Sequence, residues 1–195
     1  MVRTEAQNAA MRAATSERLL LSAMACFVEY GYSAVTVRKI AAHAGLSVGV
    51  LYQHYPNKTA LLLAAFERSM EQVRATFAVA AASTGSGQLP ALVRAAAATV
   101  REHLAFWQLG YAARHQPEIT RALGPALETW TEEIVALLSA LLSQAGVREP
   151  TLDALALFAQ IDGMCVHFAL APDSYPLEAV AEQVIANVSL RLRAS

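Results

Sequence analysis

The chain has 195 residues, of which 55% are hydrophobic and 16% are charged. This composition excludes an intrinsically disordered chain, because disorder requires low hydrophobicity and a high net charge. Its 41 alanines, against nine glycines and seven prolines, favour helices. The two cysteines, Cys26 and Cys165, are too few for a disulfide framework or a multi-cysteine zinc site, so we expect reduced thiols.

The sequence carries no signal for secretion or for a membrane span. Charged or polar residues interrupt most apolar stretches, and none approaches the roughly 18 clean apolar residues that a span requires. Residues 1–14 contain Arg3 and Arg12 but lack the apolar core of a secretory signal. We therefore expect a cytoplasmic globular protein without a membrane partner.

The charges are divided unevenly along the chain, although the net charge is only -1. Residues 1–60 carry six basic and three acidic side chains, whereas residues 61–195 carry nine basic and thirteen acidic ones. Both lysines, Lys39 and Lys58, lie in the first part. This asymmetry indicates a polyanion-binding part joined to a part with a different role.

The first predicted helices are separated by glycines. Apolar residues recur at helical spacing over residues 16–30, with Thr15 as the N-cap and Gly31 as the residue that follows the helix. A second, short helix begins after Thr36 and stops at Gly45. No stretch alternates with period two for long enough to predict a sheet, so we expect an all-α fold.

The remaining elements are also predicted to be helices. Ser47 caps a third helix, Val48–His54, and Pro56 closes it. Asn57 then caps a fourth helix over residues 58–82, which a flexible linker at residues 83–87 follows. Further helices are expected over residues 89–115 with a break, 125–145, 151–170 and 176–193.

Two short helices joined by Gly45-Leu46-Ser47 form the pattern of a helix-turn-helix. The glycine permits a sharp turn, Leu46 is expected to be buried between the helices, and Ala41 is small enough for close approach. In this motif the second helix enters the major groove of DNA. The alternative is an alanine-rich helical protein in which two short helices merely flank a glycine.

The exposed side of Val48–His54 has residues suited to reading DNA. Gly49 permits close approach of the backbone, and Gln53 can pair with adenine. Tyr52 and His54 can donate to phosphates or bases. Thr36 and Lys58 lie at helix N-termini, which attract phosphate.

Two runs surround these residues, GYSAVTVRKIA at residues 31–41 and AGLSVGVLYQHYPNK at residues 44–58. Through these runs, and over residues 16–66 as a whole, the sequence resembles the DNA-binding region of the TetR family of transcriptional regulators. The most specific part of this resemblance is the Leu-Tyr-x-His-Tyr-Pro-x-Lys element at residues 51–58.

The resemblance implies a three-helix DNA-binding domain at residues 1–60. The helix at residues 58–82 would link it to a helical effector-binding and dimerisation domain at residues 61–195. Val48 stands where such proteins often have a basic or polar residue. The predicted DNA-binding residues, most of them matched by the family's pattern, are Thr36, Arg38, Ser47, Val48, Gly49, Tyr52, Gln53, His54 and Lys58.

The last two predicted helices are apolar around much of their circumference, which suits an interface between two subunits. In the family these helices usually pack against those of a second subunit, and a homodimer also suits half-sites one turn apart. The alternative is a monomer whose core includes both helices. The predicted interface residues are Phe158, Ile161, Cys165, Phe168, Val180, Val184 and Val188.

Aromatic and polar residues in the second part predict a small-molecule pocket. Trp107, Tyr111 and His115 share one helical face, and a mostly apolar pocket between helices is typical of an effector site. Each of these aromatic residues could instead belong to the core, and Asp162 could serve the dimer interface. The predicted effector-binding residues are Trp107, Tyr111, His115, Trp130, Asp162, Met164 and His167.

An enzyme is the competing class of protein, and the sequence offers no catalytic constellation for it. Cys165 and His167 lie two residues apart on one helix, so they point in different directions. His103 and His115 are too far apart for a metal-binding face, and no glycine-rich phosphate loop is present. We expect no enzymatic activity, no cofactor and no metal.

The predicted function is that of a ligand-responsive regulator that binds a palindromic operator as a homodimer and is released by a small apolar or aromatic effector. Repression is the predicted direction, because it is the commoner one in the family. Activation, regulation without an effector, or a helical interaction module remain as alternatives. The last would leave Arg38, Lys39 and Lys58 unexplained.

Overall fold

The computed structural model describes residues 4–82, 87–113 and 117–193. All regular structure in these ranges is helical, which confirms the predicted all-α fold. The chain divides into two compact units, Met1–Met70 and Glu71–Ser195. Each unit is described by itself below.

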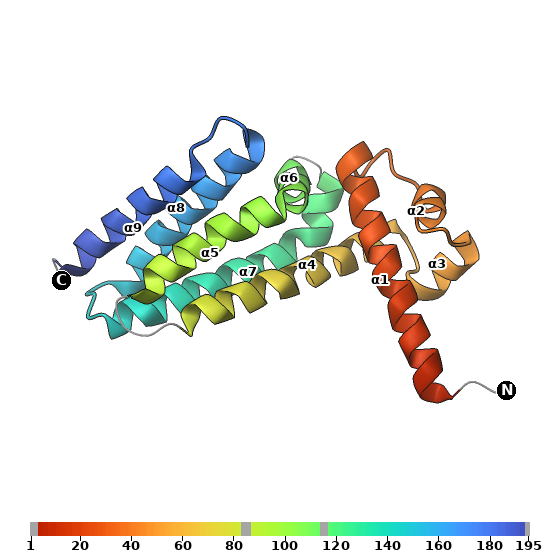
Figure 1. Cartoon of the computed structure of the whole chain (residues 1–195), viewed down its shortest axis with the longest axis horizontal. Coiled ribbons are helices and arrows are strands. Elements are labelled where there is room, and N and C mark those ends of the chain that lie inside the picture. Colours follow the sequence, from red (N-terminus) through yellow and green to blue (C-terminus); the bar gives the residue numbers. More distant parts are fainter. Residues whose placement is uncertain (1–3, 83–86, 114–116, 194–195) are drawn as a thin grey trace. The chain divides into compact units, whose positions relative to one another are not determined.

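The first unit is built around a short helix pair that lies against α1 (Figure 1). Its helices are α1 (Glu5–Tyr30), α2 (Val37–His43), α3 (Val48–His54) and the start of α4 (Lys58–Ala81). They share one apolar core, whose fully buried side chains include Leu19, Phe27, Ile40, Leu51 and Leu61. Polar contacts add to this packing, since Arg68 donates two hydrogen bonds to the Glu17 carboxylate at 3.1 and 3.3 Å.

Helix α1 begins eleven residues earlier than predicted, at Glu5 instead of residue 16. Thr4 and Gln7 form a capping box at its start, and the Thr15 hydroxyl, predicted to cap the helix, donates to the carbonyl of Met11 at 2.8 Å. Residues 4–14 are all exposed. Because this part of the helix buries no apolar face, its sequence does not show the apolar spacing on which the predicted start depended. Its alanines and the capping box favour the helix instead.

The bounds of α2 and α3 agree with the prediction. Thr36 accepts a hydrogen bond from the Lys39 amide and Ser47 accepts one from the Val50 amide, both at 3.2 Å. Gly45, in the turn between them, has φ +62°, a conformation that glycine adopts at little cost. Leu46 is half-buried, so the prediction that it would be buried between the helices is wrong.

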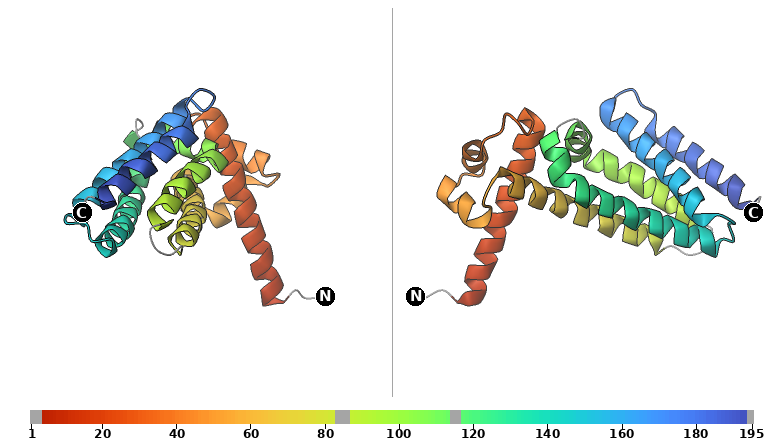
Figure 2. Two further views of the ribbon diagram at one scale, coloured as in Figure 1. Left: turned by 60° about the vertical axis from the view of Figure 1, so that its left-hand side comes forward. Right: turned by 180° about the vertical axis from the view of Figure 1, so that it is seen from behind.

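The second unit is a helical bundle in which α8 lies in contact with four other helices (Figures 1 and 2). It contains the end of α4 and five further helices, α5 (Gln88–Glu102), α6 (Leu104–Ala113), α7 (Pro117–Gln144), α8 (Pro150–Leu170) and α9 (Leu177–Arg193). The predicted break between residues 89 and 115 lies at His103. Helices α5 and α9 are joined by ion pairs from Arg94 to Glu182 and from Arg101 to Glu178.

Helix α7 starts eight residues earlier than predicted, so Pro125 lies inside the helix and not at its start. Proline lacks the amide hydrogen of a helical residue and usually ends or kinks a helix. In the turns before it, however, Ile119 and Leu123 are buried in the bundle core. Their burial favours a helix on both sides of Pro125.

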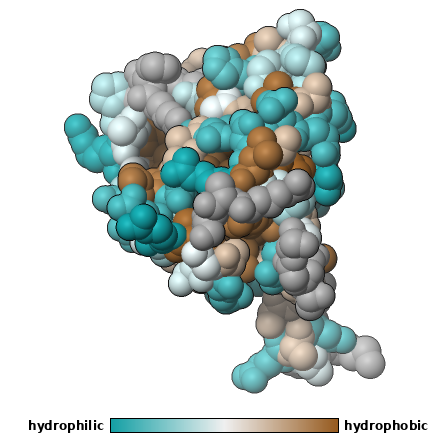
Figure 3. Space-filling model, turned by 90° about the vertical axis from the view of Figure 1, so that its left-hand side faces the viewer, coloured by the Kyte–Doolittle hydropathy of each residue, from teal (hydrophilic) through white to brown (hydrophobic). Residues whose placement is uncertain are grey.

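By length and composition alone, α8 is the one described helix that could cross a membrane, with a mean hydropathy of 1.3. Asp153 and Asp162 interrupt it, so an uninterrupted apolar run is absent. It contacts α5, α6, α7 and α9, and a helix with packed neighbours on several sides is apolar for that reason. Figure 3 shows one face of the molecule, on which apolar patches lie between hydrophilic residues.

Candidate functional site

The outward side of α3 forms the candidate DNA-binding surface. Leu51 is fully buried and anchors the helix, whereas Tyr52 is 53% exposed. Gly49 and Gln53 are also exposed, while Val48 and His54 are half-buried. Gly49, Tyr52 and Gln53 therefore lie on the accessible side of a short helix whose first turn is capped by Ser47.

Basic residues of α2 lie near this surface in the first unit. Arg38 is exposed, as is Lys39, whose Nζ lies 2.8 Å from the centroid of the Tyr30 ring. A cation over an aromatic face is attracted by the ring's quadrupole. Lys39 is therefore held against α1, whereas Arg38 is an exposed cation of the same helix.

Lys58 has structural partners that the sequence did not reveal. Its Nζ donates hydrogen bonds to the carbonyl oxygens of Tyr32 at 2.8 Å and Val35 at 3.1 Å. It also lies 4.1 Å from the centroid of the Tyr32 ring. The ammonium group has three N–H donors, so these two bonds leave a third donor for a phosphate.

A groove between α1 and α3 adds a residue that the sequence analysis missed. Its walls are Met11, Arg12 and Thr15 from α1, and Val50, Gln53 and His54 from α3. Arg12 is exposed there, beside two of the predicted reading residues. The Thr4-x-x-Gln7 capping box was the signal that would have extended α1 far enough to include it.

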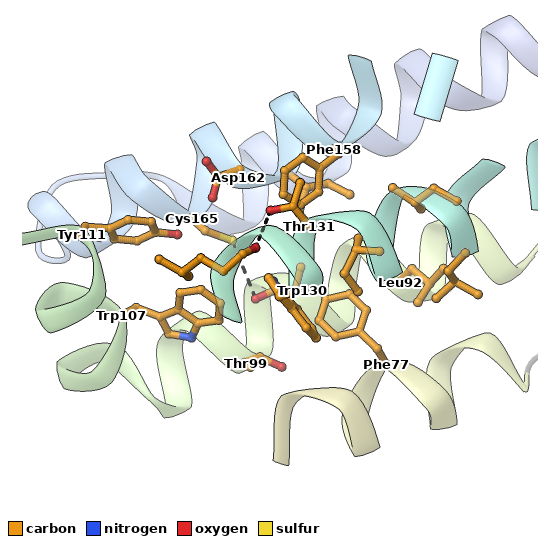
Figure 4. A pocket seen from close by; sticks show the side chains of 16 residues that line it. Phe77, Leu92, Thr99, Trp107, Tyr111, Trp130, Thr131, Phe158, Asp162 and Cys165 are labelled. Carbon is orange, nitrogen blue, oxygen red and sulfur yellow. Dashed lines mark hydrogen bonds between the residues drawn. The ribbon is translucent and has the colours of Figure 1, made fainter. Parts of the chain in front are cut away.

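The second unit contains a largely apolar pocket with a cavity of about 80 Å³ (Figure 4). Trp107 and Tyr111 of α6 stack with ring centroids 5.9 Å apart, and Phe77 of α4 meets Trp130 of α7 edge-on at 5.9 Å. The lining side chains labelled in Figure 4 are Phe77, Leu92, Thr99, Trp107, Tyr111, Trp130, Thr131, Phe158, Asp162 and Cys165.

The few polar groups of this pocket differ in how they are satisfied. The Thr131 hydroxyl donates to the Leu127 carbonyl at 2.9 Å. The buried Thr99 Oγ1 and Trp107 Nε1 have no hydrogen-bond partner within the part of the chain that the structure describes. Burial, with a smaller contribution from Asp162, raises the pKa of Cys165 to about 12, so this thiol is protonated and unreactive near neutral pH.

Four of the seven predicted effector-binding residues line the pocket: Trp107, Tyr111, Trp130 and Asp162. Met164 is buried elsewhere in the bundle, and the exposed His167 stacks on Tyr175 with centroids 5.9 Å apart, so neither lines it. His115 lies outside the described residues. Phe77 of α4 and Thr99 of α5 also line the pocket, although neither was among the residues predicted for it.

Comparison with known families decides the identity of both parts. The family model described as bacterial regulatory proteins, tetR family, matches residues 19–65. A second model, described as tetracyclin repressor-like, C-terminal domain, matches residues 87–189. The chain belongs to the TetR family. Members of this family are transcriptional regulators and not enzymes, which confirms the prediction that the chain is not an enzyme.

Two curated relatives match this TetR-family regulator over short stretches. The HTH-type transcriptional repressor Rv1474c of Mycobacterium tuberculosis is 36% identical over 63 residues, which are 32% of this chain and 34% of that protein. The HTH-type transcriptional activator FasR of Mycolicibacterium smegmatis is 41% identical over 56 residues, 29% and 26% of the two chains. The chain thus spans about a third or less of the length of these relatives.

Solved structures resemble the TetR-family regulator over nearly its whole length. A transcriptional regulator from Rhodococcus sp. RHA1 superposes with a TM-score of 0.78 at 20% identity, covering 92% of this chain and 96% of that one. FadR of Bacillus subtilis in complex with stearoyl-CoA has a TM-score of 0.72 at 18% identity, covering 87% and 95%. At such identities the likeness shows the fold alone.

The structure of the TetR-family regulator buries most of the residues predicted for a dimer interface within a single chain. Ile161, Cys165, Phe168, Val184 and Val188 are each at most 8% exposed, against the prediction that a partner covers them. Phe158 and Val180 are half-buried. The large apolar side chains left exposed on α8 and α9 are Leu152, Leu155, Leu170 and Leu190.

Proposed function

We propose that this chain is a repressor that binds a palindromic DNA operator as a homodimer and leaves it when a small apolar or aromatic molecule occupies the pocket of the second unit. The observation that carries the proposal is the capped α2–α3 pair, which leaves Gly49, Tyr52 and Gln53 accessible on α3. Because its target is bacterial DNA, we assign the protein to the cytoplasm.

In the proposed complex, α3 enters the major groove. Gln53 reads an adenine edge, and Tyr52 and His54 contact phosphates or bases. Arg12 of α1 and Arg38 of α2 contact the phosphate backbone. The remaining predicted contacts come from Thr36, Ser47, Val48, Gly49 and Lys58.

The proposed dimer interface uses the exposed stripe of α8 and the neighbouring face of α9. On α8, Leu152, Leu155 and Leu170 recur with helical spacing and are 59%, 48% and 71% exposed. On α9, Leu190 is 64% exposed. Apolar stripes of this kind are the surfaces that a second copy would cover in an isologous interface.

Effector binding is proposed to act through α4, which is continuous from Lys58 to Ala81 and so contributes residues to both units. Phe77 of this helix lines the pocket, whereas Lys58 at its start holds the loop after α1. A ligand shifts an equilibrium only through different affinities for two states. The effector would favour a spacing of the two α3 helices that does not fit the operator.

Activation is the second candidate, because the relative FasR is named as an activator whereas Rv1474c is named as a repressor. The two relatives match this chain over similarly short stretches. Repression remains the proposed direction, and a reporter gene placed behind the operator distinguishes the two.

Selection of bound sequences from random duplex DNA tests the proposal directly. We expect enrichment of an inverted repeat whose half-sites are about one helical turn apart. Enrichment of single half-sites would contradict the dimer, and absence of any enriched sequence would contradict operator binding. The selected duplex then serves to test release by small molecules.

A further inference from the structure

Two buried polar atoms in the pocket wall have no partner within the described part of the chain. Among the residues that the structure describes, neither Trp107 Nε1 nor Thr99 Oγ1 has a hydrogen-bond partner. Figure 4 shows these two side chains on one side of the pocket and Asp162 on another. Because buried polar groups in native proteins are almost always paired, such atoms mark the place of a ligand or an ordered water.

The indole nitrogen restricts the chemistry of that ligand. Indole N–H is a donor only, so its partner must be a hydrogen-bond acceptor, whereas the Thr99 hydroxyl can donate or accept. The walls around them are aromatic and aliphatic, with Trp107 stacked on Tyr111 and Phe77 against Trp130. A flat, largely apolar molecule with an acceptor atom at one edge suits these walls.

The charges of the pocket restrict the ligand further. The described lining residues include one acidic side chain, Asp162, and no lysine, arginine or histidine. Arg74, whose guanidinium lies 5.8 Å from the Trp130 ring, is already paired with Glu133 at 2.9 Å. A buried anion without a cationic partner is strongly disfavoured.

We propose that the pocket selects an uncharged aromatic molecule with a carbonyl-type acceptor that accepts the Trp107 Nε1 hydrogen bond, and that it rejects carboxylates. This inference rests on the proposed function, since it names the class of effector.

Three small probes that share a phenyl ring test the proposal on the full chain: acetophenone, ethylbenzene and benzoate. Acetophenone has an uncharged acceptor, ethylbenzene lacks an acceptor, and benzoate is an anion. The chain contains two tryptophans, so its ¹H–¹⁵N spectrum has two indole signals, which the Trp107→Phe variant assigns. Titrations followed by these signals give the affinity of each probe.

We expect acetophenone to bind about fivefold more tightly than ethylbenzene, as one added hydrogen bond implies, and to shift the Trp107 indole signal. Benzoate is expected to bind at least about tenfold more weakly than acetophenone. In Trp107→Phe, which retains an aromatic ring, the preference for acetophenone over ethylbenzene should disappear. Trp130→Phe removes the other indole of the pocket and should weaken both probes together, which leaves their ratio unchanged.

Three results would overturn the proposed ligand class: benzoate binding as tightly as acetophenone, an unchanged ratio in Trp107→Phe, or no binding by any of the probes. Operator binding by the same preparation is measured separately with the selected duplex. If operator binding and release by other compounds persist while one of these results is obtained, the ligand class is wrong and the proposed function stands. If the probes behave as expected but no DNA is bound, the proposed function fails instead.

Discussion

Lys58 Nζ donates to the carbonyl of Tyr32 at 2.8 Å and lies over the ring of the same residue, 4.1 Å from its centroid. The Tyr32 hydroxyl in turn lies 2.9 Å from Thr59 Oγ1. The first residues of α4 thus hold the loop that follows α1 from two sides. The one lysine that the family pattern assigns to DNA therefore also stabilises the DNA-binding unit.

Lys58→Ala tests both roles of this side chain. We expect the free energy of unfolding to fall by about 1 to 3 kcal/mol, because the carbonyls of the buried residues Tyr32 and Val35 lose their charged donor. The slope of log affinity against log salt concentration should also fall by about 0.9 per half-site if Lys58 contacts a phosphate. Urea denaturation and DNA titrations at several salt concentrations measure the two effects. Unchanged stability would contradict the structural role, and an unchanged slope would contradict the phosphate contact.

Arg12→Ala tests the groove between α1 and α3. Arg12 is exposed, so we expect no change in stability, but a loss of affinity for all DNA sequences and a salt slope reduced by about 0.9 per half-site. Arg148→Ala, which removes another exposed arginine, in the second unit, is the matched control and should leave DNA binding unchanged. Equal behaviour of the two variants would remove Arg12 from the DNA-binding surface.

Gln53→Ala should relax the preference at one base position in each half-site, at a cost of about 1 to 3 kcal/mol for the operator, because a bidentate contact to an adenine edge is lost. Repeating the sequence selection with the variant measures this change. A uniform loss over all sequences would mean that Gln53 contacts the backbone and reads no base.

Leu155→Glu tests the proposed dimer interface. Leu155 is 48% exposed in the single chain, so a charge there should leave the subunit folded but make it monomeric and weaken operator binding. Val79→Glu, at a position that is 76% exposed on α4, is the control and should remain a dimer. Sedimentation and thermal unfolding of both variants separate loss of association from loss of folding. A Leu155→Glu variant that still sediments as a dimer would place the interface elsewhere.

The raised pKa of the Cys165 thiol predicts that stability depends on pH. Burial raises the pKa of this thiol from 9.0 to about 12, so in alkaline solution the unfolded chain releases the proton before the folded chain does. The stabilisation is complete below pH 9 and is lost as the pH rises from about 9 through about 12, by at most about 1.4 kcal/mol per pH unit. Urea denaturation between about pH 8 and 10.5 should show a shallower decline for Cys165→Ala. Identical declines for the two proteins would show that Cys165 does not titrate differently on folding.

The sequence by itself determined the features that depend on local chemistry. Thr36 and Ser47 can cap only the turn that follows them, and Gly45 allows the positive φ between the two short helices, so the bounds of α2 and α3 follow from a few neighbouring residues. The same stretch carries the family pattern. Where no such signal was present, or where it was misread, as at the start of α1 and around Pro125, the predicted bounds were wrong.

Only the tertiary structure decided which sides of the apolar helices face inward. Helix α8 is apolar around most of its circumference, so its sequence has no single apolar stripe to distinguish the buried Ile161 from the exposed Leu155. Lys58 contacts two residues that lie more than twenty positions earlier in the chain. Thr99 and Trp107 line one pocket although they belong to different helices. Such contacts are set by packing, because a spacing pattern reports neighbours on one helix but not the element packed against it.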